Sequence, residues 1–366
     1  MPAEWEQHEA TWMAWPHFRG DWPGKFETIP WVYAEIIRNL SAHERVELIV
    51  TDARSEQRAR QTLKLANAFN QNVRFHRWPT NRVWTRDSGC TFVTGKAGPD
   101  DWTTRGSRGT GVLRHRRQRG SAPLRAIKWR FNAWAKYPNY RHDEKIGSRM
   151  SEAANADEMR AYCGDVRVIL EGGSIDVNGT GTLLTTEECL LSKVQERNPG
   201  FRRQDYEQIF ANYLGIRQVI WLGKGIAGDD THGHVDDITR FVSAETIVTM
   251  IESNRNDKNY PPLQENLRRL KSATGPDGKP FRIVELPMPA PVMFEGRRLP
   301  ASYGNFYIAN GIVLVPVFND ANDRIALHTL ADLFPTRDVI PIYSGDLIWG
   351  FGAIHCMTQQ QPAVGG

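Results

Sequence analysis

The stretch RRQDYEQIFANYL, residues 202–214, carries the clearest helical pattern in the chain. Its apolar residues, which recur at spacings of three and four, are Tyr206, Ile209, Phe210, Tyr213 and Leu214. This spacing places them on one face of an α-helix. Short β-rich runs flank the helix at residues 181–186 and 218–222. The stretch therefore predicts a strand, a helix with one buried face, and a second strand.

The same alternation recurs outward from this unit in both directions. Helical patterns are expected at 151–162, 263–270 and 327–334, and β-rich runs at 166–170, 247–251, 282–286 and 312–318. Successive helices begin roughly 50 to 60 residues apart, a period typical of repeat architectures. We therefore expect an α/β repeat array. If such an array closes on itself, its loops gather around a central axis, where a functional site can form.

Composition places the chain among ordinary globular proteins. Of its 366 residues, 40% are hydrophobic and 24% are charged, and no run of about 18 apolar residues is present. The N-terminal residues lack a basic flank followed by an apolar stretch, so we expect a cytoplasmic protein without a membrane partner. The four cysteines lie far apart without a CxxC pair, which predicts free thiols rather than a disulfide framework or a zinc knuckle.

The net charge of +4 comes from one segment. Nine Lys or Arg and no Asp or Glu occur between Arg105 and Arg130, and the rest of the chain is mildly acidic. Residues 95–123 are rich in Gly and Arg and have neither helical nor alternating periodicity, so we predict a disordered insertion there. Trp102 is the lone aromatic residue in this insertion, which disfavours nucleic-acid binding through stacked bases.

Four polar clusters stand next to glycines and β-rich runs, where loops commonly carry function. They are WTRDSG at residues 84–89, EGGS at 171–174, HGHVDD at 232–237 and GFGAIHCMTQQ at 350–360.

These clusters contain the groups that hydrolysis of a guanidinium compound requires. A planar cation is best held by carboxylates that accept its forked N–H donors, and two such groups are the minimum. The carbon of the cation is a poor electrophile, so a thiolate is a suitable nucleophile. One histidine can protonate the departing ammonia and then activate water. Cys356 and His234 fit these two roles.

The residues alone leave other interpretations open. Cys356 could be an inert core thiol, Asp87 a turn residue, and Glu171 a carboxylate at a strand end. His232, His234 and Asp236 could instead form a zinc or manganese site, because alternate residues of a strand point the same way.

Taken together, the motifs resemble the agmatine deiminase family, part of the guanidino-group-modifying enzymes. The matching stretches are PAEWE at residues 2–6, TWMAWP at 11–16, WRFNAW at 129–134, EGGS at 171–174, GTLLTTEECL at 181–190, GHVD at 233–236 and HC at 355–356. The resemblance spans nearly the whole chain. It implies one catalytic domain over residues 1–366, folded as a five-bladed α/β propeller (pentein) of ββαβ units around a central channel.

The resemblance also implies the roles of the site residues. Cys356 would attack, His234 would act as acid and base, Asp87 and Asp236 would hold the guanidinium group, and Glu171 would orient the histidine. No cofactor and no metal would be needed, and the protein would form a homo-oligomer. The implied reaction is agmatine plus water giving N-carbamoylputrescine and ammonia, a step in polyamine synthesis.

Trp84 and Trp12 are candidates to contact the far ammonium of the substrate through cation–π interactions. The chain departs from the family pattern at residues 87–90, where Cys90 replaces the proline of an Asp-x-Gly-Pro run. Alternatives are a deiminase of free or peptidyl arginine, a metal-dependent ureohydrolase using His232, and a binding protein that has lost catalysis.

Overall fold

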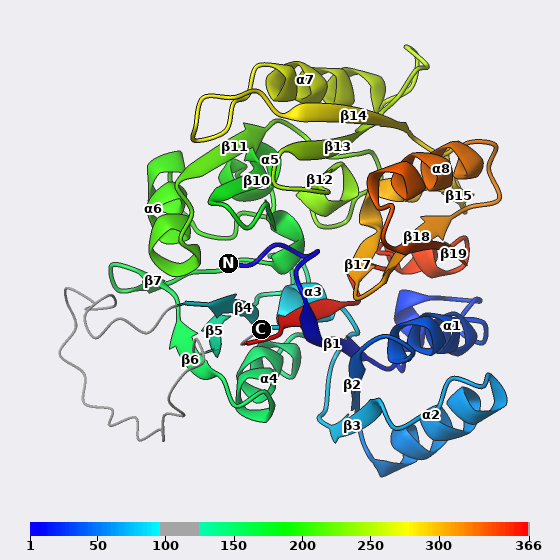
Figure 1. Ribbon diagram of the computed structural model, residues 1–366. Helices are drawn as coiled ribbons and strands as arrows, with labels where there is room; N and C mark the ends of the chain where they lie inside the picture. Colours follow the sequence, from blue (N-terminus) through cyan, green and yellow to red (C-terminus); the bar gives the residue numbers. More distant parts are fainter. Residues whose placement is uncertain (96–123, 365–366) are drawn as a thin grey trace.

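The computed structural model describes residues 1–95 and 124–364 (Figure 1). Apart from Gly95, the insertion predicted at residues 95–123 lies outside the described residues. The fold is a mixture of helices and short strands, as the sequence predicts. No helix within residues 1–95 and 124–364 is long and apolar enough to cross a membrane.

Five sheets follow one plan. In four of them the first strand is antiparallel to the second, and the second is parallel to the third. These sheets are β4 (Thr91–Thr94), β5 (Leu124–Lys128) and β6 (Asp157–Arg160); β9 (Asp176–Val177), β10 (Thr182–Thr186) and β11 (Gln218–Leu222); β12 (Thr239–Phe241), β13 (Thr246–Ile251) and β14 (Arg282–Pro287); and β17 (Tyr307–Ala309), β18 (Ile312–Val317) and β19 (Asp338–Tyr343).

The fifth sheet joins the two ends of the chain. Its order is β20 (Gln359–Pro362), β1 (His8–Ala14), β2 (Arg45–Val50) and β3 (Val73–Arg77). β20 runs antiparallel to β1, and β1, β2 and β3 are parallel to one another, so the same plan is extended by one strand. The N and C labels accordingly lie near the centre of Figure 1. Two hairpins, β7 (Tyr162–Cys163) with β8 (Val166–Arg167) and β15 (Met293–Phe294) with β16 (Arg297–Arg298), complete the strands in the described residues.

Helices provide the crossovers between the parallel strands, as parallel pairing requires. They are α1 (Ile29–Ser41), α2 (Ala53–Leu65), α4 (Ile146–Ala153), α5 (Glu187–Leu191), α6 (Arg203–Leu214), α7 (Tyr260–Lys271) and α8 (Asp323–Leu333). In Figure 1 α2, α4, α6, α7 and α8 lie at the periphery. The predicted helix at 202–214 is confirmed as α6: its apolar face is buried and Gly215, with φ of 71°, ends it in the left-handed conformation.

Two predicted elements are wrong. The helix expected at 151–162 begins earlier, at Ile146, and ends at Ala153. Asn155 then adopts a left-handed φ of 52°, and Asp157–Arg160 becomes β6 because it pairs with β5. The strand expected at 166–170 is confined to Val166–Arg167. The other predicted strands and helices are confirmed within a few residues of their ends.

Candidate active site

Five short turns, one before the first strand of each sheet, carry the polar side chains of the site. They are α3 (Thr85–Ser88) before β4, the 3-10 turns Gly172–Ser174 before β9, Val235–Asp237 before β12 and Tyr303–Asn305 before β17, and the turn at residues 354–357 before β20. Neighbouring turns contact one another from α3 through to Tyr303–Asn305. Residues far apart in the sequence therefore meet at one place.

A cavity of about 440 Å³ opens over these turns. Asp87 and Cys356 lie on its wall, and Trp84 lies beside them. The remaining lining residues are Phe18, Gly20, Asp21, Pro23, Arg82, Trp134, Tyr137, Asp230, Thr231, Phe294, Glu295, Arg297, Trp349, Gly350, Phe351 and Gly352. His234, Asp236 and Glu171 do not line the cavity; they lie behind Asp87 and Cys356. A cavity of this size suits a small molecule.

Cys356 is held by Asn305, a residue that the sequence analysis did not select. The Asn305 Nδ2 donates to the thiol sulfur at 3.1 Å and to Asp237 Oδ1 at 2.9 Å, while Asn305 Oδ1 accepts from the Cys356 backbone N–H at 3.3 Å. Asp236 Oδ2 lies 3.8 Å from the sulfur. Burial and the nearby carboxylates of Asp236, Asp237 and Asp87 raise the pKa of the Cys356 thiol well above its usual value. In the ligand-free site Cys356 is therefore a protonated thiol.

Unpartnered polar atoms face one another around Gly173. Neither ring nitrogen of His234 has a hydrogen-bond partner among the described residues, and neither does Asp236 Oδ1. The His234 Nδ1 lies 3.9 Å from Asp87 Oδ1 and 4.0 Å from Asp236 Oδ1. Buried polar atoms are rarely left without partners, so this arrangement is typical of a site that completes its hydrogen bonds with a ligand.

Gly173 keeps this space open. A Cβ atom at residue 173 would lie 2.5 Å from His234 Nδ1, 3.0 Å from Asp236 Oδ2 and 3.1 Å from Asp87 Oδ1. Any side chain there would therefore occupy the gap between the three groups. The Gly173 backbone N–H also donates to Asp87 Oδ1 at 3.1 Å.

Asp87 receives a second donor from Trp134. The indole N–H of Trp134 lies 2.9 Å from Asp87 Oδ2. Burial raises the pKa of Asp87 to about 6, a shift that His234 and the Trp134 hydrogen bond oppose and that Asp236 and Glu171 reinforce. Asp87 is thus ionised above about pH 6 and able to accept hydrogen bonds from a cation.

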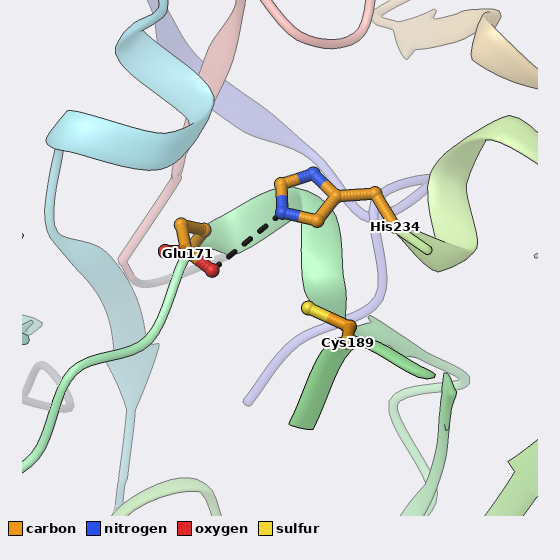
Figure 2. Close-up of side chains that lie close together, drawn as sticks. All are labelled: Glu171, Cys189 and His234. Atoms are coloured by element: carbon orange, nitrogen blue, oxygen red, sulfur yellow. Dashed lines mark ion pairs between the residues drawn. The ribbon is translucent and has the colours of Figure 1, made fainter. Parts of the chain in front are cut away.

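Glu171 faces the Nε2 atom of the His234 ring, whereas Asp87 faces the Nδ1 atom. Figure 2 shows Glu171 and His234 together. The Glu171 Oε2 is 3.6 Å from His234 Nε2, and the two Glu171 oxygens accept from Arg197 Nε at 3.2 and 3.3 Å. Burial alone would raise the pKa of Glu171, but Arg197 and His234 lower it below its usual value. For His234, burial favours the neutral ring, yet Asp87, Cys189 and Glu171 raise its pKa well above the ordinary value. The ligand-free site therefore contains an imidazolium ion.

Metal binding is poorly matched to these side chains. Glu171, Cys189 and His234 offer oxygen, sulfur and nitrogen within 4.8 Å of one another (Figure 2), a donor set that zinc accepts. The Arg197 guanidinium already pairs with Glu171 and would repel a second cation.

The alternative metal cluster of His232, His234 and Asp236 is wrong. It assumed a strand, but His232 has a left-handed φ of 64° and Val235–Asp237 form a 3-10 turn, so the side chains do not alternate. The His232 Nε2 instead lies 3.1 Å from Ser192 Oγ.

The two tryptophans chosen from the sequence have different positions. Trp84 lines the cavity, as expected of a substrate contact. Trp12 does not: it is 1% exposed, its ring stacks on Trp78 and its N–H donates to Gln361 Oε1 at 3.0 Å. The prediction that Trp12 contacts substrate is therefore wrong, because its ring is used in the core. Cys90 is also a core residue and lies away from the cavity wall.

Comparison with known proteins identifies the family. The model of the Porphyromonas-type peptidyl-arginine deiminase family matches residues 1–362. The chain belongs to this family. One relative, from Legionella pneumophila and named "Putative agmatine deiminase", is 34% identical over 365 residues, which cover 99% of this chain and 94% of that protein.

Solved structures of agmatine deiminases share the fold of this family member. The enzyme of Enterococcus faecalis superposes with a TM-score of 0.85 at 28% identity, covering 99% of this chain and 95% of that one. A Campylobacter jejuni agmatine deiminase with one cysteine replaced by serine and substrate bound has a TM-score of 0.79 at 28% identity, with the same coverage.

Proposed function

We propose that this protein hydrolyses agmatine to N-carbamoylputrescine and ammonia, a step in polyamine synthesis. The observation that carries the proposal is that Cys356 and Asp87 lie on the wall of one cavity, with His234, Asp236 and Glu171 behind them. Agmatine deiminases among the relatives and solved structures support the choice of substrate.

The guanidinium group binds between Asp87 and Asp236 in this proposal. The two carboxylates accept its N–H donors bidentately, and Asp236 Oδ1 is free to do so. The positive charge of the substrate offsets the carboxylates that keep the Cys356 thiol protonated, so the thiol releases its proton to solvent when substrate binds. Substrate binding thereby activates the nucleophile.

The first chemical step forms a carbon–sulfur bond. The Cys356 thiolate attacks the guanidinium carbon and gives a tetrahedral adduct. The His234 imidazolium donates a proton to one terminal nitrogen, the carbon–nitrogen bond breaks and ammonia departs. The product of this step is a thiouronium group on Cys356 and a neutral His234.

The second step releases the product. His234 takes a proton from water, and the hydroxide oxygen attacks the thiouronium carbon. The carbon–sulfur bond then breaks, and the hydroxyl proton of the adduct passes to the departing sulfur, which restores the Cys356 thiol and the His234 imidazolium. The carbonyl oxygen of N-carbamoylputrescine thus comes from water. Glu171 holds the His234 ring in one orientation through both steps.

The charges of the cavity favour agmatine over arginine. Its lining residues include four acids, Asp21, Asp87, Asp230 and Glu295, and two bases, Arg82 and Arg297. Asp21 pairs with Arg82, and Asp230 pairs with Arg297 at 3.1 Å, so both bases are neutralised. The excess of acid suits a substrate with a second cation and no carboxylate.

We also infer how the sheets are arranged, the oligomeric state and the cellular location. The five sheets, each preceded by a turn that contributes to the site, support a five-bladed propeller with the site on its axis. The family resemblance supports a homo-oligomer, and the free thiols fit the cytoplasm. Sedimentation of the purified protein tests the oligomeric state.

Turnover with product identification tests the function. Purified protein is incubated with agmatine, free arginine or a peptidyl-arginine substrate, and ammonia and product mass are measured. We expect ammonia and N-carbamoylputrescine from agmatine alone. Preferential turnover of an arginine substrate, or urea release that a chelator abolishes, would reject agmatine deimination.

Replacement of the nucleophile tests the mechanism. Cys356→Ala should lower kcat by roughly a thousandfold or more while the melting temperature changes little. Cys163→Ala is the matched control, because Cys163 lies in the β7–β8 hairpin outside the cavity and should keep full activity. Turnover by Cys356→Ala would contradict the covalent mechanism.

A further inference from the structure

A buried chain of charged side chains continues from Asp236 away from the cavity. We propose that His355 and Glu4 are positioning residues for the proposed reaction, and that they hold Asp236 ionised and correctly oriented without contacting substrate. This inference rests on the proposed function. It assigns a role to the N-terminal segment, where Glu4 precedes the first strand, β1.

The His355 ring links two carboxylates. Its Nδ1 lies 2.6 Å from Asp236 Oδ2, and its Nε2 lies 2.8 Å from Glu4 Oε2. Both contacts are buried. A carboxylate oxygen accepts hydrogen bonds, so both ring nitrogens must donate, and only the imidazolium form of histidine has two N–H groups. The geometry therefore requires a positive charge between Asp236 and Glu4.

Both carboxylate oxygens of Glu4 accept hydrogen bonds from several donors. Besides His355, its oxygens accept from Arg240 Nη2 at 2.9 Å, from the backbone N–H of Ile308 at 2.9 Å and from Arg86 Nη2 at 3.2 Å. The second donor group of Arg240, its Nε, pairs with Asp176 Oδ1 at 3.0 Å. Glu4 is thus linked to several sheets. Arg86 lies in α3 before β4, Arg240 lies in β12 and Ile308 lies in β17, and Arg240 also pairs with Asp176 of β9.

The charges in this network balance when His355 is charged. The three carboxylates of Glu4, Asp176 and Asp236 face three cations, Arg86, Arg240 and His355. A neutral His355 would leave one buried negative charge uncompensated, which is costly in a medium of low dielectric constant. The network is thus built around a cationic His355.

The two carboxylate oxygens of Asp236 therefore have different surroundings. Oδ2 is fixed by His355, while Oδ1 has no hydrogen-bond partner within residues 1–95 and 124–364 and faces His234 Nδ1 at 4.0 Å. Burial alone would raise the pKa of Asp236, but the hydrogen bond and charge of His355 lower it below the ordinary value. Asp236 therefore stays ionised, and its Oδ1 remains available to accept a hydrogen bond from the substrate.

His355 also sets the position of the nucleophile. It directly precedes Cys356, and its backbone N–H donates to Asn305 Oδ1 at 3.0 Å, the same oxygen that accepts from the Cys356 N–H. The ring and the backbone of His355 are therefore both anchored beside the attacking sulfur.

Several other groups act on the pair formed by Asp236 and His355. The groups that face Asp236 are His234, Cys356, Asp237, Asp87 and Arg240, and those that face His355 are Glu4, Tyr307 and the Asp176–Arg240 pair. A change at the Glu4 carboxylate removes a charge that also faces Arg86 and Arg240, but it leaves the residues around Asp236 themselves unaltered, so the substitution of Glu4 is the most direct test.

The first variant is Glu4→Gln, which keeps the shape of the side chain and removes its charge. His355 then loses the carboxylate that faces its Nε2, and the hold of His355 on Asp236, which lowers the pKa of that carboxyl group, is weakened. We expect kcat/KM on agmatine to fall about tenfold near pH 6 and less than about threefold near pH 9, where Asp236 remains ionised. KM should account for most of the loss.

The second variant and the control separate positioning from folding. His355→Gln keeps a donor toward Asp236 but no charge, so it should show the same pH-dependent loss. Glu44→Gln is the matched control: Glu44 is also a buried carboxylate 3.3 Å from a histidine, His8, yet it lies outside the cavity, and His8 reaches Glu4 through the Glu4 backbone carbonyl rather than its carboxylate. Glu44→Gln should lower the melting temperature without changing the shape of the pH profile.

A loss of activity in Glu4→Gln that is equal at all pH values, accompanied by a lower melting temperature, would mean a purely structural role and would overturn the proposal. Nitrogen-15 NMR of the wild-type histidine rings, with His355 assigned from His355→Gln, tests the charge without any substrate. Two protonated ring nitrogens are expected, and one unprotonated nitrogen would refute the network. If the wild type fails to turn over agmatine, the proposed function fails, and the NMR result still decides the charge of His355.

Discussion

Asp87 lies where the cavity meets the buried side chains, and its ionisation limits the site. Its raised pKa results from burial, and the His234 charge and the hydrogen bond from the Trp134 indole oppose the shift. Below about pH 6 Asp87 gains a proton and loses the charge that attracts a guanidinium group. Activity should therefore decline as the pH falls through this value.

Trp134→Phe should move this decline to higher pH. The substitution removes the 2.9 Å hydrogen bond to Asp87 Oδ2 but keeps an aromatic ring against Phe131 and Tyr137. Loss of a donor to the ionised form raises the pKa of Asp87 further, so we expect the acid limb of kcat/KM to shift upward by about half a unit to one unit. Rate measurements between about pH 5 and 9 on agmatine check this.

Trp129→Phe is the matched control for Trp134→Phe. The Trp129 N–H donates at 2.9 Å to Thr91 Oγ1, also in a buried position, but neither residue lines the cavity. Its pH profile should match that of the wild type. Coincident profiles for all three proteins would mean that Asp87 does not control the acid limb.

At the scale of elements, the turn Gly172–Ser174 brings the backbone closest to the centre of the site. Gly173 lies between His234, Asp236 and Asp87, where a Cβ atom would lie within 3.1 Å of all three. The turn acts as a spacer whose missing side chain leaves room for the substrate.

Gly173→Ala should abolish most of the activity without unfolding the protein. One methyl group would push His234 or the carboxylates away, and we expect kcat/KM to fall by about a hundredfold or more. Gly223→Ala serves as control, because a Cβ atom there meets its nearest neighbour, Asn266 Oδ1, at an ordinary 3.4 Å. Steady-state kinetics with thermal melts distinguish the two variants. Wild-type activity in Gly173→Ala would show that the gap is not used by the substrate.

Local periodicity predicted the helices that bury one face, such as α6, because their pattern depends on neighbours in the sequence. It failed for residues 157–160, because their strand exists only through pairing with β5, thirty residues earlier. The site shows the same division. Asp87 and Cys356 were selected from the sequence for their chemistry, and the family motif also supports Cys356. Asn305 and Trp134 were not selected, because their contacts with Cys356 and Asp87 arise from distances across the fold.

One signal in the sequence could have revealed Asn305. The run Ser302–Asn305 is a short polar turn just before a strand, like the turns that contain Asp87, Glu171 and Asp236. Comparing the five turns with one another, rather than searching for acids and cysteines, would have selected it.

At the scale of the whole molecule, the pairing of β1 with β20 joins the two ends of the described chain in one sheet. The register joins Thr11 to Gln360 and Trp12 to Gln359. The C-terminal strand also provides acceptors to buried side chains, since Gln360 Oε1 accepts from Arg86 at 2.6 Å and Gln361 Oε1 accepts from Trp12. The fold therefore depends on its last strand.

Deletion of residues 359–366 should destroy cooperative folding. The edge of β1 would be exposed and Arg86 would lose a buried partner, so we expect aggregation or a melt without a sharp transition. Gln361→Leu, which removes just the Trp12 hydrogen bond, should cost about 1–3 kcal/mol. Circular dichroism melts and size-exclusion chromatography provide the readout. A sharp melt close to that of the full-length chain would contradict this dependence.

The network around Glu4 has a consequence for protein synthesis. Glu4 leaves the ribosome before the other residues of the site, and His355 and Cys356 emerge after them. Because domains fold as their segments emerge, the Glu4 carboxylate is without its histidine partner while the intervening chain folds. Synthesis that stops before Cys356 yields a polypeptide that lacks the proposed nucleophile and should release no ammonia.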